Sequence, residues 1–270
     1  MMPELPEVET IRRQLVEKVV GARIKKVEVR LAKVMKNSTS GTELLEGKAI
    51  TGVFRRGKWL WLALEGDWAL AFHLGMTGQL VWEGKGELPP HTHLLIELDR
   101  GRLRFTDFRQ FGRVRLGKSK EIRDYLEEKL GPEPLSPIFS ASYLENVLAK
   151  SRRPVKALLL DQKAVAGLGN IYTDEALFLA GIDPRRPACT LAEDEVKKLH
   201  EAIQKVLAEG IAHRGTSIRN YVDATGVAGE HGLFLHVYGR GGQPCLRCGT
   251  LIKKIKLCGR GTHFCPHCQR

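Results

Sequence analysis

The first residues of the chain combine an imino acid with two carboxylates, a set that could perform covalent chemistry on a sugar. Residues 3–7 read Pro-Glu-Leu-Pro-Glu. If Pro3 were the first residue of the mature chain, its nitrogen would be a secondary amine, and an α-amino group with a pKa of about 8 is partly unprotonated at neutral pH. Such an amine can attack an aldehydic carbon to form an iminium, while Glu4 or Glu7 donates a proton to the leaving oxygen. Proline and glutamate are equally typical of an ordinary helix start, and five residues alone leave both interpretations open.

Four of the six cysteines have the spacing of a zinc site. Cys245 and Cys248 form one Cys-x-x-Cys pair, Cys265 and Cys268 form another, and 16 residues separate the pairs. Two such pairs supply four thiolates that close a tetrahedron around one Zn²⁺ ion. Disulfides are the alternative, but nothing in the sequence indicates secretion. We therefore expect one structural zinc ion.

Positive charge is concentrated at the C-terminal end of the chain. The protein has 43 Lys and Arg against 31 Asp and Glu, a formal net charge of +12. Residues 231–270 contain no Asp or Glu, whereas seven basic residues occur there: Arg240, Arg247, Lys253, Lys254, Lys256, Arg260 and Arg270. Such a segment favours a polyanionic partner, and nucleic acid is the obvious candidate. On charge alone, a solvated basic surface without a partner is the alternative.

Two glycine-flanked positions, Asn170 and Arg260, could contact phosphate groups. Asn170 follows Gly-Leu-Gly and opens a helix-like segment at 171–180, and a helix start presents free backbone N–H groups to an anion. Arg260 lies between two glycines and between the two cysteine pairs, where the backbone can approach DNA closely. An ordinary interhelical turn and an ordinary hairpin loop would explain the same residues.

The elements that must position these residues follow from the hydrophobic pattern. Apolar residues at 8, 11, 15 and 19 have helical spacing and predict an amphipathic helix that ends near Gly21. From about residue 23 to residue 116, short β-prone runs are separated by glycine-containing turns, which is typical of an antiparallel sandwich or barrel. These runs lie at 26–30, 59–64, 68–74, 94–98 and 102–106.

The second half of the chain has a helical pattern and begins after a proline-rich linker. Residues 131–137 contain three prolines and a glycine, which cannot continue a helix. The zinc segment is too short for a core of its own and needs the metal to fold. We therefore expect an α+β protein with an N-terminal domain over 1–130, a linker at 131–137, a helical domain over 138–237 and a zinc finger over 238–270.

Composition excludes a membrane-spanning or disordered chain. The 270 residues are 43% hydrophobic and 27% charged, a globular composition, and no stretch approaches 18 uncharged apolar residues. The first nine residues are acidic and lack the basic-then-apolar order of a secretory signal. An intracellular, cytoplasmic protein is the expectation.

Eight motifs in series carry a resemblance to one family. They are Pro-Glu-Leu-Pro-Glu-Val-Glu-Thr at 3–10, Arg-Gly-Lys at 56–58, His-Leu-Gly-Met-Thr-Gly at 73–78, Asp-Phe-Arg-Gln-Phe-Gly at 107–112, Gly-Pro-Glu-Pro-Leu at 131–135, Gly-Leu-Gly-Asn-Ile-Tyr at 167–172, Tyr-Gly-Arg at 238–240, and the zinc ribbon at 245–268. In this order they closely resemble bacterial formamidopyrimidine-DNA glycosylases, over essentially the whole chain. The resemblance implies an N-terminal helix with an antiparallel β-sandwich, a helical domain with a helix–two-turn–helix, and a zinc ribbon.

The family resemblance also implies a catalytic mechanism. The family excises oxidised purines, chiefly 8-oxoguanine and formamidopyrimidines, and then cleaves the abasic strand by β,δ-elimination. Carried over to this chain, Pro3 attacks C1′ of the damaged nucleoside, Glu4 assists opening of the deoxyribose ring, and Glu7 is a supporting carboxylate. Lys58 contacts phosphate and transfers a proton in β-elimination, whereas Arg260 binds phosphates and is linked to δ-elimination.

Further residues are implied in binding duplex DNA. An extruded base leaves a gap in the helix, and Met76, Arg109 and Phe111 match the residues that fill it. His91 and Arg152 resemble DNA-contact sites, Asn170 resembles the phosphate-binding asparagine, and 216–235 corresponds to a lesion-covering loop. The implied partner is duplex DNA with oxidised purines or abasic sites, bound by a monomer without an evident protein partner.

One departure from the family pattern concerns the N-terminus. The chain begins Met1-Met2-Pro3 instead of Met-Pro, and an amide-bonded proline nitrogen is not nucleophilic. We expect that Met2 is the true start or that both methionines are removed. Three alternatives to the main interpretation stay open: a sibling glycosylase that prefers oxidised pyrimidines, a non-catalytic DNA-binding protein on the same scaffold, and a zinc-ribbon ribosomal or transcription factor.

Overall fold

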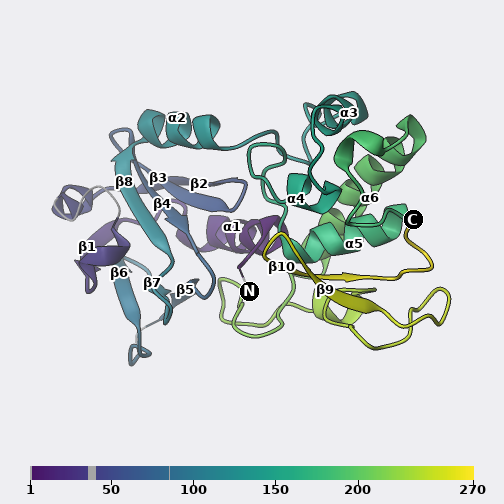
Figure 1. The fold of residues 1–270 in the computed structure, drawn as a ribbon. Coiled ribbons are helices and arrows are strands. Elements are labelled where there is room, and N and C mark those ends of the chain that lie inside the picture. Colours follow the sequence, from purple (N-terminus) through teal and green to yellow (C-terminus); the bar gives the residue numbers. More distant parts are fainter. Residues whose placement is uncertain (1, 36–40, 85) are drawn as a thin grey trace. The chain divides into compact units, whose positions relative to one another are not determined.

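The chain forms two units, each built from residues that are distant in sequence. The computed structural model describes residues 2–35, 41–84 and 86–270. Met1–Glu128 and His213–Gly232 make up the first unit, and Lys129–Ala212 and Leu233–Arg270 make up the second. Figure 1 shows the elements of each unit along the chain.

The first unit is organised around helix α1, Leu5–Val19. The apolar residues predicted to line one face of this helix, Val8, Ile11, Leu15 and Val19, are each at most 1% exposed. They pack into one hydrophobic core with residues from both sheets of the unit. Burial of this apolar face supplies most of the helix's stability. The core therefore fixes the helix whose first turn follows Pro3.

Two four-stranded antiparallel sheets enclose this core. One has the order β2-β3-β4-β8 and the other the order β1-β6-β7-β5, so the predicted sandwich of antiparallel strands is confirmed. Five of the eight strands overlap the runs predicted from the sequence. The bounds are β1 Ile24–Val29, β2 Ile50–Arg56, β3 Trp59–Leu64, β4 Trp68–His73, β5 Gln79–Glu83, β6 Thr92–Leu98, β7 Arg102–Thr106 and β8 Arg113–Lys118, followed by helix α2, Ser119–Lys129.

Residues 213–232 return from the helical half of the sequence to the first unit. The side-chain amide of Gln14 on α1 donates to Asp223 at 2.9 Å, and the backbone N–H of Trp82 donates to the Ala224 carbonyl at 2.8 Å. This grouping differs from the expected division, in which these residues go with the helical domain over 138–237. The difference arises because the hydrogen-bond partners of the segment lie in the first 82 residues.

The second unit is helical and carries a terminal hairpin. Its helices are α3 Ala141–Ala149, α4 Val155–Leu159, α5 Asn170–Ala180 and α6 Glu193–Ala212, and its strands are β9 Lys253–Leu257 and β10 Arg260–Phe264. Gly210 lets α6 approach α5 closely, because a Cβ at this position would lie 2.5 Å from the Tyr172 ring. None of these helices, nor any other in the described part of the chain, is long and apolar enough to cross a bilayer. The α+β fold class is confirmed.

Candidate functional site

The first turn of α1 holds the two N-terminal glutamates in buried positions. Pro3 is buried, and Glu4 and Glu7 are each 1% exposed. The Glu4 backbone N–H donates to Glu7 Oε2 at 2.8 Å, which is half of a capping box. The Glu7 carboxylate therefore lies in the first turn after Pro3, and the hydrogen bond from Glu4 N–H fixes its orientation.

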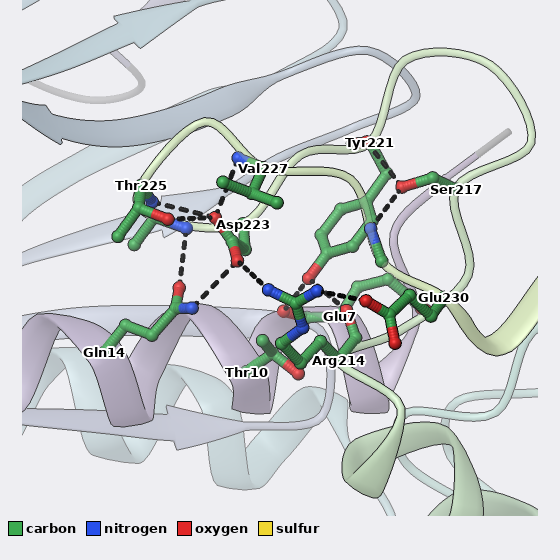
Figure 2. Close-up of polar contacts among 12 residues, drawn as sticks. Glu7, Thr10, Gln14, Arg214, Ser217, Tyr221, Asp223, Thr225, Val227 and Glu230 are labelled. Atoms are coloured by element: carbon green, nitrogen blue, oxygen red, sulfur yellow. Dashed lines mark hydrogen bonds and ion pairs between the residues drawn. The ribbon is translucent and has the colours of Figure 1, made fainter.

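Glu7 also contacts the returning segment of the first unit (Figure 2). Its Oε1 accepts a hydrogen bond from Thr216 N–H at 2.7 Å. The Tyr221 hydroxyl donates to the Glu7 carbonyl at 3.3 Å. Burial, followed by the charges of Glu7 and Asp223, raises the pKa of Tyr221 well above its usual value, so its hydroxyl stays a donor. Residues 216–221 are thereby fixed against the start of α1.

Polar contacts order the rest of this segment (Figure 2). The fully buried Asp223 carboxylate accepts from Gln14, from the Thr225 hydroxyl and from Val227 N–H. Burial alone would raise the pKa of Asp223, but these hydrogen bonds lower it below the ordinary value. Arg214 pairs with Glu230 at the base of the segment. Between this segment and Pro3 lies a small pocket, lined by Met2, Pro3, Glu7, Thr216, Ile218, Arg219, Asn220 and Tyr221.

Lys58 lies in a two-residue turn between β2 and β3. Arg56 pairs with Trp59, which leaves Gly57 and Lys58 as the turn, and Gly57 has a φ of 55° that favours glycine. The Lys58 side chain is 5% exposed. A cation desolvated to this degree in the same unit as Pro3 has a stronger interaction with an anionic ligand than a surface lysine has.

His73, which the sequence analysis did not single out, lies beside Lys58. Burial, reinforced by the charges of Lys58 and Arg113, lowers the pKa of His73 to about 4. The imidazole is therefore neutral at pH 7, and because its Nδ1 accepts from Gly75 N–H at 3.2 Å, its Nε2 carries the proton. The sequence feature that could have identified His73 is its position as the first residue of the motif 73–78. His73 offers a neutral N–H donor next to a buried cation.

Two loops of the first unit present the residues expected to fill a gap in DNA. The loops 74–78 and 107–112 pack backbone against backbone, since a Cβ on Gly75 would lie 2.7 Å from Gly112 N. Phe111 is 51% exposed, and the Arg109 guanidinium lies 4.8 Å from the centre of its ring. A cavity of about 310 Å³ opens beside them, lined by Met2, Trp59, His73, Gly75, Met76, Phe111, Arg113 and Tyr125. The structure thus brings Met76, Arg109 and Phe111 to one surface.

The fully buried Asp107 orders this pair of loops. Its carboxylate accepts from the Thr77 hydroxyl, from Gly112 N–H at 2.6 Å and from Arg109 N–H at 3.3 Å. Asp107 N–H donates to the carbonyl of His91, an exposed residue with a φ of 62°. Asp107 therefore contacts both His91 and Arg109. Asp107 and Thr77 are positioning residues that the sequence analysis missed, although both lie in quoted motifs.

In the second unit, Asn170 and the hairpin of Arg260 are in direct contact. Asn170 is the first residue of α5, and its side-chain amide donates to the Gly261 carbonyl at 2.8 Å. Arg260 begins β10 and is exposed. Arg152 is exposed in the connection between α3 and α4. Asn170 and Arg260 therefore form one candidate phosphate-binding surface within this unit.

Glu175 is a further residue that the sequence did not reveal, and it binds the backbone at the start of the motif 238–240. Its buried carboxylate accepts from three consecutive backbone N–H groups, those of His236, Val237 and Tyr238, at 2.8–2.9 Å. Burial alone would raise the pKa of Glu175, but these bonds and one from the His236 ring lower it. A buried glutamate in a mostly apolar helix is the signal that would have identified it.

The four cysteines of the two pairs converge as the spacing predicts. The sulfur atoms of Cys245, Cys248, Cys265 and Cys268 all lie within 4.8 Å of one another. Cys245 and Cys268 sulfurs are 3.9 Å apart, and Cys248 and Cys265 sulfurs are 3.5 Å apart. A tetrahedral zinc with Zn–S bonds of about 2.3 Å requires S···S separations of about 3.8 Å, so the donor set fits one structural Zn²⁺ ion. Phe178, Val237 and Ile252 pack beside the cluster.

Comparison with protein families gives matches along nearly the whole chain. Residues 2–114 match the formamidopyrimidine-DNA glycosylase N-terminal domain. Residues 130–222 match the formamidopyrimidine-DNA glycosylase H2TH domain. Residues 242–270 match a zinc finger found in FPG and IleRS, which agrees with the geometry of the cysteine cluster.

Similar proteins cover the chain from end to end. The formamidopyrimidine-DNA glycosylase of Moorella thermoacetica is 52% identical over 94% of this chain and 95% of its own length. The crystal structure of the MutM (Fpg) protein from Thermus thermophilus matches with a TM-score of 0.91 and 44% identity, over 99% of this chain and 98% of that one. A complex between Lactococcus lactis Fpg and DNA containing an abasic site matches with a TM-score of 0.92 and 40% identity, over 99% of both chains.

Proposed function

This chain belongs to the formamidopyrimidine-DNA glycosylase family, and from that premise we propose that it is a bifunctional base-excision repair enzyme. It excises oxidised purines, 8-oxoguanine and formamidopyrimidines, from duplex DNA and then cleaves the abasic strand by β,δ-elimination. The observation that carries the proposal is the double hydrogen bonding of Glu7, to Glu4 N–H and Thr216 N–H. Pro3 and Glu7 line a small pocket together with residues of the segment 216–221.

The proposed reaction begins at the Pro3 nitrogen. Once terminal, this nitrogen attacks C1′, the bond from C1′ to the base breaks, and the base leaves with a proton. Glu4 protonates the ring oxygen of the deoxyribose as the ring opens, and the nitrogen and C1′ then form an iminium. The burial of Glu4 and Glu7 supports these assignments, since water is excluded from the start of α1.

Strand cleavage then uses cations that bind the flanking phosphates. Lys58 binds phosphate near the reacting sugar and transfers a proton during β-elimination, which expels the 3′ phosphate. Arg260 binds phosphate and promotes δ-elimination, which expels the 5′ phosphate. The buried position of Lys58 and the exposed position of Arg260 on a short hairpin support these two roles.

DNA recognition requires that the damaged base leave the helix. Met76 and Phe111 stack in the gap, and Arg109 faces the orphaned base, while His91, Arg152 and Asn170 contact the DNA backbone. The complex between Lactococcus lactis Fpg and DNA containing an abasic site supports DNA as the partner, and we propose that this protein binds duplex DNA as a monomer. The zinc ion holds the ribbon that carries Arg260. Because the proposed substrate is DNA and the relatives are bacterial, we propose that the protein acts in the bacterial cytoplasm, at the nucleoid.

A free imino nitrogen is a condition of this mechanism. We propose that translation starts at Met2 or that both Met1 and Met2 are removed, since the lone pair of an amide-bonded Pro3 nitrogen is delocalised into the carbonyl group and cannot attack. Intact-mass analysis of an active preparation tests this point: the active species should begin at Pro3, and a fully active preparation that retains Met1 would exclude Pro3 as the nucleophile.

Borohydride trapping on an 8-oxoguanine:C duplex tests the proposed function. Reduction of the iminium should give a covalent protein–DNA adduct, and peptide mapping should locate the deoxyribose remnant on Pro3. A chain with an uncleavable N-terminal extension is the control and should give no adduct. An adduct on another side chain would refute the mechanism, and absence of any adduct would favour a non-catalytic DNA-binding protein. Faster excision from a thymine-glycol duplex would favour the pyrimidine-preferring alternative.

A further inference from the structure

A buried ion pair in the second unit contacts the hairpin that carries Arg260. Lys156 Nζ lies 2.6 Å from Asp174 Oδ1, and the two side chains are 1% and 0% exposed. Lys156 is the second residue of α4, and Asp174 lies one turn into α5. None of the motifs that define the chemistry of the site includes either residue.

The pair uses its remaining hydrogen-bonding groups on β10. Lys156 Nζ donates to the Gly261 carbonyl at 3.0 Å and to the Thr262 hydroxyl at 2.9 Å. These two hydrogen bonds come in addition to the ion pair of the ammonium group with Asp174. Asp174 Oδ2 accepts from His263 N–H at 2.9 Å. Three consecutive residues, 261–263, are thus held by one ion pair.

The hairpin ends beyond these residues in a tight turn, and Arg260 beside the turn pairs with Leu257 of β9. Cys258 and Gly259, with φ values of 48° and 76°, form the turn, and both are exposed, as is Arg260. The cysteine ligands of the zinc lie beyond the other end of the two strands, at 245–248 and 265–268. The zinc therefore fixes the base of the hairpin, whereas the ion pair fixes the residues next to Arg260.

Stability alone does not explain a buried pair of this kind. Removal of two charges from water costs several kcal/mol per ion, and replacement of a buried pair by apolar residues is often neutral or stabilising. An apolar pair would, however, remove the bond from Lys156 to the Gly261 carbonyl, which would keep only its bond from Asn170, and the bond from His263 N–H to Asp174. What the charged pair adds is one defined position for the backbone of 261–263.

We propose that Lys156 and Asp174 are positioning residues that fix Arg260 for δ-elimination. The inference rests on the proposed function, in which Arg260 binds the phosphate that leaves in this step. A misplacement of about 1 Å in a catalytic group can lower a rate by about 100-fold. Loss of the pair should therefore slow δ-elimination selectively, while excision and β-elimination, assigned to Pro3, Glu4 and Lys58 in the first unit, proceed at their usual rates.

The double variant Lys156→Met with Asp174→Asn tests the inference, because it leaves no unpaired buried charge. On an abasic duplex under single turnover, we expect δ-elimination to slow by about tenfold or more, β-elimination to change by less than about twofold, and zinc content to stay at one per chain. Lys197→Met is the matched control, since Lys197 and Glu193 are also 2.6 Å apart but are 55% and 67% exposed. This control should keep both rates.

A combination with Arg260→Ala separates the inference from the function on which it rests. If the pair acts through Arg260, adding the double variant to Arg260→Ala should cause no further loss of δ-elimination. Wild-type δ-elimination in the double variant, with a loss in Arg260→Ala, would refute the inference and leave the function intact. A full additional loss in the combined variant would also refute it. Unchanged δ-elimination in Arg260→Ala would refute the role of Arg260 and the inference with it.

Thr262→Val provides a second test if the double variant loses zinc. This substitution keeps the side-chain shape and removes one acceptor of Lys156 Nζ. We expect a smaller slowing of δ-elimination, about twofold to tenfold, with normal β-elimination. Equal slowing of both steps would indicate a general structural effect and would contradict the proposed role.

Discussion

Glu7 Oε1 accepts a hydrogen bond from Thr216 N–H at 2.7 Å, across 209 residues of sequence. The other oxygen of the same carboxylate accepts from Glu4 N–H at 2.8 Å. One side chain therefore joins the residues beside Pro3 to the segment that closes the adjacent pocket. Because both contacts require an acceptor, the group at position 7 must present two oxygens.

Glu7→Gln should disrupt this connection while keeping the size of the side chain. One oxygen becomes an NH₂ group and faces an N–H donor, so a buried hydrogen bond is lost and a donor stays unsatisfied. We expect the free energy of unfolding to fall by about 1–3 kcal/mol. Excision of 8-oxoguanine should fall by about tenfold or more, because the link that this side chain makes between Glu4 and Thr216 is broken. Urea denaturation and single-turnover excision measure the two effects.

Glu17→Gln is the control for this prediction, since Glu17 lies on the same helix but is exposed. It should leave stability and excision within experimental error of the wild type. Equal effects of the two substitutions would mean that charge on α1, rather than the contact with Thr216, determines the loss.

Phe111→Ala should weaken excision, because the ring is expected to fill the gap left by an extruded base. Stacking of an aromatic side chain with a base contributes about 1–3 kcal/mol, so single-turnover excision should fall by about 5-fold to 150-fold. Phe54→Ala is a matched control, because Phe54 is 48% exposed and Phe111 is 51% exposed. Phe54 stacks on Trp61, with ring centres 5.5 Å apart. If both substitutions slow excision equally, the assignment of Phe111 as a gap-filling residue is wrong.

Local patterns in the sequence predicted the parts of the molecule that local interactions determine. The helical spacing of Val8, Ile11 and Leu15 predicted α1, and the two Cys-x-x-Cys pairs predicted the zinc site, because each pattern lies within a short stretch of chain. The antiparallel strands followed from short β-prone runs separated by glycine-containing turns. The fold class could therefore be predicted from residue types and spacing.

Contacts between distant residues could not be predicted in this way. The hydrogen bond from Thr216 to Glu7 is one of the contacts that join 213–232 to the first unit, and no pattern near residue 216 indicates it. The ion pair of Lys156 with Asp174 depends on the packing of α4 against α5. Family motifs supplied candidate residues such as Arg260, whereas the residues that position them became visible only in three dimensions.

His73 should make the protein less stable in acid. Its pKa is lowered from 6.5 to about 4 in the folded protein, so the unfolded chain binds a proton more readily between these values. Stability from this neutral imidazole is fully present above pH 6.5 and is lost as the pH falls through 4, by at most about 3 kcal/mol. Urea denaturation at pH 7 and pH 4.5 should show a smaller acid loss in His73→Gln than in the wild type. Parallel losses in the two proteins would contradict the prediction.

Zinc removal should weaken DNA binding before it unfolds the β-rich unit. The ribbon has no independent core, so its backbone should lose order once the four thiolates lack their metal, and the phosphate contacts proposed for Arg260 and Asn170 should be lost with it. All four tryptophans, at 59, 61, 68 and 82, lie in the first unit, and their fluorescence therefore reports on that unit alone. During titration with a chelator, affinity for lesion DNA and its dependence on salt should both fall while tryptophan emission stays constant, and added Zn²⁺ should restore binding. Unchanged affinity in zinc-free protein would show that the ribbon does not contribute to binding, and a simultaneous change in emission would show that the first unit depends on the metal.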